Sequence, residues 1–345
     1  MPVLSERTEQ ILRHLVTDYI TTASPVGSGA LTEQHGLNVS AATVRNEMVK
    51  LEEDGFIHRP HASAGGVPSD KGYRFFVESL PPQAVPPGEA KETLEIEIAS
   101  VRREVEEWAR TISSAVAELI GTVAFATPPR LSTFRVKQLE LIHLHDTSAL
   151  LVLILHGASV HKLLIPIAAP RPPEYLEHTR NRVASVVADR TAGEIEANIP
   201  RGMDALETDV IDSTLGVLRS EEARSAPRYE WSGLSELLAQ PEFADSGQGR
   251  EIVDVLEGGE TLSAVVSEAP TDGSVGVYIG SEMGLGRMQA FSVIVCRYGR
   301  PGEPVGTVGL IGPTRLHYSL AMPVVSHAAS LLGRLSAEVA PEGVA

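Results

Sequence analysis

The sequence predicts a multidomain α+β protein, and three observations predict it. The chain has 345 residues, which exceeds the ~250 residues at which single hydrophobic cores stop growing. Residues 1–80 favour helices followed by one pair of strands, whereas the remainder alternates blocks of strand-like and helix-like sequence. Apolar residues make up 43% and charged residues 21% of the chain, as is typical of globular proteins that bury a core. We therefore expect two or three domains.

Composition narrows the classes of function. The longest apolar runs, 149–155 and 292–296, are strand-sized and far below the ~18 residues of a membrane span. The first residues also lack the basic and apolar segments of a signal peptide. We expect a cytoplasmic protein that makes no membrane contact. Cys296 is the only cysteine, which excludes an intramolecular disulfide and a cysteine zinc cluster, and its strand-like surroundings predict a buried, inert thiol.

The charge balance argues against DNA binding if it is averaged over the chain. The net charge is −16, and residues 1–80 carry seven Lys and Arg against ten carboxylates. Neutralising phosphates requires clustered cations. A DNA-binding function must therefore rest on specific geometry, with the acidic excess placed on other domains.

Two capped helices are predicted at the start of the chain. The second helix is short, spans 29–35, is expected to be capped by Ser28, and ends at Gly36 in the left-handed conformation. The first helix is capped by Ser5, and its apolar face comprises Ile11, Leu12, Leu15, Val16, Tyr19 and Ile20.

A third predicted helix carries the candidate DNA-reading face. Ser40 caps it, it runs to Gly55, and its buried stripe is Val44, Met48 and Leu51. Small residues near its start allow close approach to base edges, and Arg and Asn can make bidentate contacts to guanine and adenine. The pattern suits a major-groove recognition helix, but the helices alone leave an ordinary solvated face equally open. The exposed residues are Ala42, Thr43, Arg45, Asn46 and Lys50.

A strand pair follows the third helix. Residues 56–59 read as a strand, 60–66 as a turn rich in small residues, and 67–68 as the start of the return strand. Helix, strand, flexible tip and strand is the layout of a winged helix-turn-helix, whose wing lies along the phosphate backbone. His58 and His61 in this wing are interpreted as phosphate donors or solvated residues, because no third metal ligand accompanies them.

Several motifs in this region and near the other end resemble one family. They are 40–48 (SAATVRNEM), 51–55 (LEEDG), 60–65 (PHASAG), 68–74 (PSDKGYR), 278–282 (YIGSE) and 302–319 (GEPVGTVGLIGPTRLHYS). Together they resemble the heat-inducible transcription repressor HrcA family over the whole chain.

The resemblance implies a function and partners. It implies a homodimer that represses heat-shock chaperone operons of the groE and dnaK type by binding an inverted-repeat operator on double-stranded DNA, the CIRCE element. It also implies that the GroEL chaperonin supports the active state. The family usually has Arg in place of Gly66 and commonly in place of Gly29, so two expected backbone contacts are missing. The predicted DNA-binding residues are Ser40, Ala42, Thr43, Arg45, Asn46, Lys50, Arg59, His61, Ser63, Lys71 and Arg74.

The segment after the winged helix-turn-helix is predicted to be a linker and a long helix. Residues 81–88 are rich in proline and read as a semi-rigid spacer. From Glu89 to Ile120, apolar residues alternate four- and three-residue steps, which predicts one continuous helix of roughly 45 Å at ~1.5 Å per residue. Such a helix could pair with its twin in a dimer or pack on a neighbouring sheet.

The next region predicts a strand meander and a helical insertion. Strands are expected at 134–145, 149–155 and 159–165, and helices at 174–190 and 204–219. His143 and His145 share a strand face near His161, so a metal site is conceivable, although polar strand faces often hold histidine. We place an inserted domain at 172–228, to which the resemblance assigns dimerisation.

The last region returns to strands. Trp231 opens a helical stretch, strands are expected at 275–279, 290–298 and 304–311, and a final helix spans 318–339. Residues 89–171 and 229–345 then form one α+β domain interrupted by the insertion, and the resemblance implies that this domain is GAF-like.

No catalytic constellation accompanies these elements. The glycines at 280–286 lack a strand-to-helix context, and 299–312 lacks a Walker lysine. We expect that the protein is not an enzyme and that it binds neither a cofactor nor a metal ion. Two alternatives remain open. One is a winged-helix repressor of a metabolic operon that responds to a small molecule in a concave apolar pocket. The other is a signalling adaptor that contacts a partner through the helix from Leu94 to Leu119.

Overall fold

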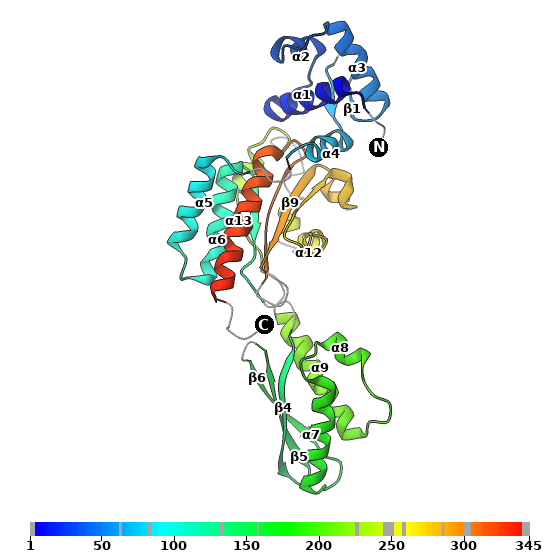
Figure 1. Cartoon of the computed structure of the whole chain (residues 1–345), viewed down its shortest axis with the longest axis vertical. Helices are drawn as coiled ribbons and strands as arrows, with labels where there is room; N and C mark the ends of the chain where they lie inside the picture. The colour runs from blue at the N-terminus through cyan, green and yellow to red at the C-terminus, as the bar shows by residue number, and fades with distance from the viewer. Residues whose placement is uncertain are drawn as a thin grey trace. The chain divides into compact units, whose positions relative to one another are not determined.

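The computed structural model describes residues 4–61, 64–81, 85–130, 134–156, 159–224, 228–243, 252–256, 260–284, 286–299 and 305–339. The chain divides into two compact units. The first contains Met1–Pro129, Arg228–Gly299 and Gly306–Ser336, and the second contains Arg130–Pro227. Helices and sheets occur in both units, so the predicted α+β class is confirmed (Figure 1). No helix among the described residues is long and apolar enough to cross a membrane.

The first unit opens with the predicted winged helix-turn-helix, which we call the head. β1 pairs antiparallel with β2, with Ile57 opposite Pro68 and His58 opposite Val67. Its elements are α1 (Glu6–Thr22), α2 (Ser28–Gln34), α3 (Ala41–Glu53), β1 (Ile57–His58), β2 (Val67–Pro68) and α4 (Asp70–Glu78).

Two of the three predicted helix caps of the head are confirmed. Ser5 accepts a hydrogen bond from the Thr8 amide, and Ser40 accepts one from the Thr43 amide. The cap assigned to Ser28 is wrong. Gly27 already has the extended backbone of a cap residue (φ −87°, ψ 152°), so α2 begins at Ser28 and has no side-chain cap.

The predicted continuous helix over 89–120 is also wrong, because it is two helices. α5 (Gly88–Ser100) and α6 (Val105–Ile120) are separated by a turn, and the indole Nε1 of Trp108 donates to the Val101 carbonyl at 3.0 Å across it. α5 and α6 pack on each other. Two successive helices therefore share the repeating apolar pattern. Of the two alternatives for this segment, pairing with its twin in a dimer or packing on a neighbouring sheet, α6 shows the second, because it packs on the main sheet.

The main sheet of the first unit has five strands in the order β7-β3-β10-β9-β8, and every neighbouring pair is antiparallel. Side chains alternate between two cores. One face, including Ala124 and Ile294, packs with α6 and α13, whereas the other, including Phe125 and Val293, packs with residues of α10 and α12 (Figure 1). The elements are β3 (Val123–Ala126), β7 (Glu230–Ser232), α10 (Leu234–Leu238), α12 (Glu260–Ser267), β8 (Val275–Ile279), β9 (Phe291–Tyr298), β10 (Gly306–Pro313) and α13 (Tyr318–Val339).

Several details of this sheet differ from the prediction or extend it. Trp231 does not open a helix but lies in the edge strand β7 opposite Phe125. The helix starts only after Gly233 (φ +89°), where a Cβ would lie 2.3 Å from the Thr122 carbonyl oxygen. Cys296 is buried in β9, and burial raises the pKa of its thiol to about 11. The thiol is therefore protonated and unreactive near neutral pH.

The second unit is a separate sheet covered by helices on one face. β4, β5 and β6 form an antiparallel three-stranded sheet, and its buried face packs against helices of the unit. We expected these strands to belong with the first α+β domain and the insertion to begin near residue 172. The compact unit instead begins at Arg130, because the meander shares its core with the helices that follow it. Its elements are β4 (Val136–His145), β5 (Ser148–Leu155), β6 (Val160–Pro166), α7 (Pro173–Val187), α8 (Ala192–Ala197) and α9 (Ala205–Arg224).

Candidate nucleic-acid interface

The helix α3 presents a polar face to solvent. Ser40 Oγ fixes its first turn by accepting from the Thr43 amide at 3.2 Å, and the two hydroxyl oxygens are 3.0 Å apart. Val44, Met48 and Leu51 are buried, as the sequence predicts. The structure therefore brings together on the solvent side the predicted residues Ala42, Arg45, Asn46 and Lys50.

A buried carboxylate, which the sequence analysis did not single out, anchors α3 to α1. Glu47 is 8% exposed and accepts hydrogen bonds from Thr8 Oγ1 at 2.9 Å and from Lys50 Nζ at 3.0 Å. The bond from Lys50 is the largest of the causes that hold the pKa of the Glu47 carboxyl below its usual value. Since buried charges need such partners, Glu47 fixes the rotation of α3 and hence the direction of its exposed face. The position of Glu47 next to Met48 of the buried stripe was the feature of the sequence that could have indicated a buried carboxylate.

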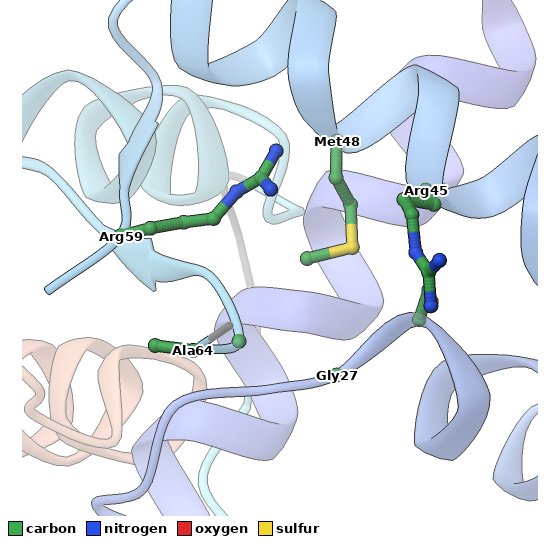
Figure 2. A pocket seen from close by; sticks show the side chains of 7 residues that line it. Gly27, Arg45, Met48, Arg59 and Ala64 are labelled. Carbon is green, nitrogen blue, oxygen red and sulfur yellow. The ribbon is translucent and has the colours of Figure 1, made fainter. Parts of the chain in front are cut away.

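A cavity of about 380 Å³ lies between α3, the start of α2 and the wing. Figure 2 shows Arg45 and Met48 descending from α3 into it, and Arg59 reaching across from the wing toward Met48. Arg59 Nη2 lies 3.1 Å from Glu52 Oε2, yet its Nε and Nη2 are buried without a hydrogen bond. Two guanidinium groups lining one cavity favour an anion there, and phosphate matches their donor geometry.

The wing places its predicted residues unevenly. His58 and His61 are exposed, which is compatible with both interpretations, phosphate donors or solvated residues. Ser63 lies outside the described residues. Gly66 is not at the wing tip, because it is buried and pairs with Val26. A Cβ on Gly66 would lie 3.0 Å from both Leu15 Cδ1 and Ile57 Cδ1, so a side chain there would enter the head's core rather than reach a phosphate.

Two other predicted contacts are engaged within the protein. Lys71 Nζ donates to the Asp54 carbonyl at 2.6 Å and lies 4.2 Å from the Phe56 ring centroid. Arg74 Nε donates to Glu282 Oε1 at 2.8 Å. Both cations are thus engaged within the protein, and their contact with DNA stays a prediction. The sequence motif contained them but gave no sign of their partners.

The histidines of β4 and β6 do not form a metal-ligand cluster. His143 and His145 are exposed, and His161 Nε2 lies 3.8 Å from Glu221 Oε1. Among the described residues, no group of three or more His, Cys, Asp or Glu is placed to hold a metal ion.

A family model and full-length relatives that resemble this chain carry the same family name. A family model described as the HrcA protein C terminal domain matches residues 106–322. A heat-inducible transcription repressor HrcA from Dehalococcoides mccartyi is 37% identical over 337 residues, covering 98% of this chain and 97% of the relative. One from Chloroflexus aggregans is 35% identical over 355 residues, covering 97% and 94%.

A solved structure supports the fold. A crystal structure described as that of a hypothetical protein at 2.2 Å resolution aligns with a TM-score of 0.58 and 23% identity, covering 97% of this chain and 98% of its own. At this identity the likeness bears on the fold alone.

Proposed function

Since the chain belongs to the HrcA family of heat-inducible transcription repressors, we propose that it binds an inverted-repeat operator, the CIRCE element, as a homodimer and so represses chaperone operons of the groE and dnaK type. Membership of a repressor family indicates a non-enzymatic regulator that binds DNA. The observation that carries the operator proposal is the exposed face of α3, where a capped start, small residues and the pair Arg45 and Asn46 face solvent.

The proposed contacts divide between bases and phosphates. Arg45 and Asn46 read base edges in the major groove, because their forked donors and acceptors match guanine and adenine. Arg59, at the cavity beside them, and His61 on the wing contact phosphates. Clustering the cations Arg45, Lys50 and Arg59 at one surface is compatible with a net charge of −16 for the whole chain. The proposed contact residues are Ser40, Ala42, Thr43, Arg45, Asn46, Lys50, Arg59, His61 and Ser63.

An apolar sheet face in the second unit supports the homodimer. The helices cover one face of the β4-β5-β6 sheet, and on the other, Ile142, Leu150 and Leu164 stand opposite one another in register. Leu164 is 69% exposed and Ile142 47%. A second copy offers an identical apolar face, and a two-fold axis through such a contact matches the dyad of an inverted repeat.

We also propose that the GroEL chaperonin supports the active repressor. This follows from the family resemblance, which implies that misfolded proteins compete for the chaperonin and so relieve repression. The small-molecule and adaptor alternatives predict operator binding that depends on a ligand, or no operator binding at all.

A mobility-shift titration tests this function. The intact protein is titrated with DNA from upstream of the chaperone operons and with the same DNA whose inverted repeat is scrambled, each with and without GroEL. We expect a shift of the native repeat at concentrations ~10³-fold lower than those needed for the scrambled DNA, as for specific repressors. Equal shifts of both DNAs, or none, would overturn the proposal.

A further inference from the structure

Two sequence motifs that the DNA-binding function does not use lie against the head. One is 278–282, which covers the end of β8 and the start of the 3-10 helix η1 (Gly280–Met283). The other is the stretch 312–318 of the motif 302–319, which joins β10 to α13. Both contact elements of the head, although they lie more than half the chain away in sequence. These contacts fall within the first compact unit.

The first contact joins α4 to η1 through two charged side chains. Asp70 Oδ2 accepts hydrogen bonds from the Ser281 amide at 2.9 Å and from Ser281 Oγ at 2.7 Å. One turn further along α4, Arg74 donates to both carboxylate oxygens of Glu282 and, through Nη2, to the Val277 carbonyl at 2.6 Å. The bidentate ion pair is the largest cause that raises the pKa of Arg74. Charge-assisted, forked pairs of this kind fix orientation as well as distance.

Glycine at position 280 makes this contact possible. Gly280 has φ +51°, and a Cβ built on it would lie 2.5 Å from both carboxylate oxygens of Asp70. Any side chain at position 280 would therefore displace the Asp70 carboxylate and its bonds to Ser281. Gly284, at the other end of η1, has a similar φ of +64° but open space around its Cβ position.

A second contact holds the end of α1. Arg315 Nη1 donates to the Ile20 carbonyl at 3.3 Å, and the same guanidinium pairs with Glu242. Beside it, the buried rings of Tyr73 and Tyr318 have centroids 6.0 Å apart. The head is therefore held at two points, α4 and the end of α1.

These contacts leave the DNA-reading face open, since Arg45 and Asn46 on α3 remain exposed. We propose that Asp70 and Arg74, bound to Ser281 and Glu282, form a latch that fixes the orientation of the head, and that this latch sets the half-site spacing the repressor accepts. The inference rests on the proposed function. When the head is rigid, binding of one half-site holds the α3 helix of the second copy at a high effective concentration near the other half-site, but only at one spacing. A head that moves freely on its proline-rich linker samples many spacings.

A pair of glycine variants tests the latch without changing charge. Full-length Gly280→Ala and the control Gly284→Ala, which bears the same positive-φ strain, are titrated with the native operator, with operators whose spacer is altered by a few base pairs, and with a single half-site. We expect Gly280→Ala to lose about tenfold on the native operator, through lower effective concentration, and to lose much of its preference for native spacing. Half-site affinity should not change, and Gly284→Ala should behave as the parent.

A charge exchange separates the latch from a direct DNA contact by Arg74. Arg74→Glu should reproduce the Gly280→Ala pattern, and Arg74→Glu combined with Glu282→Arg should recover most of the native-operator affinity. Hydrogen exchange of α4 amides in each folded variant should rise with the loss and fall with the recovery. Unchanged spacing preference in Gly280→Ala, or equal loss by Arg74→Glu on operator and half-site without recovery, would overturn the latch. Failure of the parent protein to prefer the operator would instead overturn the proposed function.

Discussion

Gly66 and Val26 exchange two backbone hydrogen bonds, each 2.9 Å long, which tie the returning strand of the wing to the loop between α1 and α2. The neighbouring Gly65 is also close to this loop, since a Cβ there would lie 2.4 Å from the Val26 carbonyl carbon, so only glycine allows the two backbones to approach this closely. The wing is thus fixed to the helical part of the head at its base. Its glycines serve this close approach and do not mark a missing phosphate contact.

Two glycine-to-arginine variants should therefore behave in opposite ways. Gly66→Arg should destabilise the head by ~1–3 kcal/mol or more, because the side chain overpacks the core beside Leu15 and Ile57. Gly29 lies exposed in α2 with nothing near its Cβ position. Gly29→Arg should fold normally and steepen the dependence of log affinity on log salt by about one unit, as for one added phosphate contact.

Thermal denaturation and operator titrations at several salt concentrations measure both effects. A stable Gly66→Arg protein with a steeper salt slope would contradict the buried position of Gly66.

Removing the Arg45 guanidinium should weaken specific binding. Arg45→Ala should lose ~1–3 kcal/mol on the operator and much less on scrambled DNA, because base contacts rather than phosphate contacts discriminate sequence. Fluorescence anisotropy with both DNAs measures the difference. Arg13→Ala, which removes an exposed cation on α1 that pairs with Glu9, is the control. Equal losses on the two DNAs would assign Arg45 to the phosphates.

Placing a charge on the open sheet face should break the homodimer. Leu164→Asp would bury a carboxylate without a partner at the proposed contact, at a cost of several kcal/mol, so the variant should sediment as a monomer. Ile199→Asp, at a comparably apolar residue that is 44% exposed elsewhere in the same unit, should remain dimeric. Sedimentation velocity distinguishes them, and a dimeric Leu164→Asp protein would exclude this face.

Mild acid should destabilise the head through His14. Burial, and then the stacked His35 ring 3.9 Å away, hold the pKa of His14 below its ordinary value of 6.5, although the nearby Asp18 opposes this. Below pH 6.5 the unfolded chain therefore binds more protons at this site than the folded head, so the free energy of unfolding falls as the pH falls through that value. His14→Gln should flatten the melting temperature between pH 7 and 5.5. An identical pH slope in the variant and the parent would refute the role of His14.

Local pattern predicted the elements whose own sequence decides them. Ser40 followed by an apolar stripe predicted the start and the buried side of α3. A strand-like run predicted the bounds of β8 to the residue, and helix-like sequence predicted those of α13. The same reasoning failed at Val101. The apolar repeat continues through it, yet α5 ends at Ser100 and α6 begins only at Val105.

The partners of the candidate site residues could not be predicted for a related reason. Arg74 was recognised as a cation within a motif, but its partner Glu282 is 208 residues away. Likewise, nothing in the order of residues indicated that Gly66 pairs with Val26 rather than standing at the wing tip. Long-range pairing depends on the topology of the whole unit, which periodicity and capping signals do not contain.

The central claim, that two copies of α3 read an inverted repeat, is tested most directly by footprinting the intact protein on DNA from upstream of the chaperone operons. We predict two protected major-groove segments related by the dyad of the repeat, both lost in Arg45→Ala at concentrations where the parent protects them. Protection of a single segment, or protection that spreads evenly along the DNA and persists in Arg45→Ala, would contradict the claim.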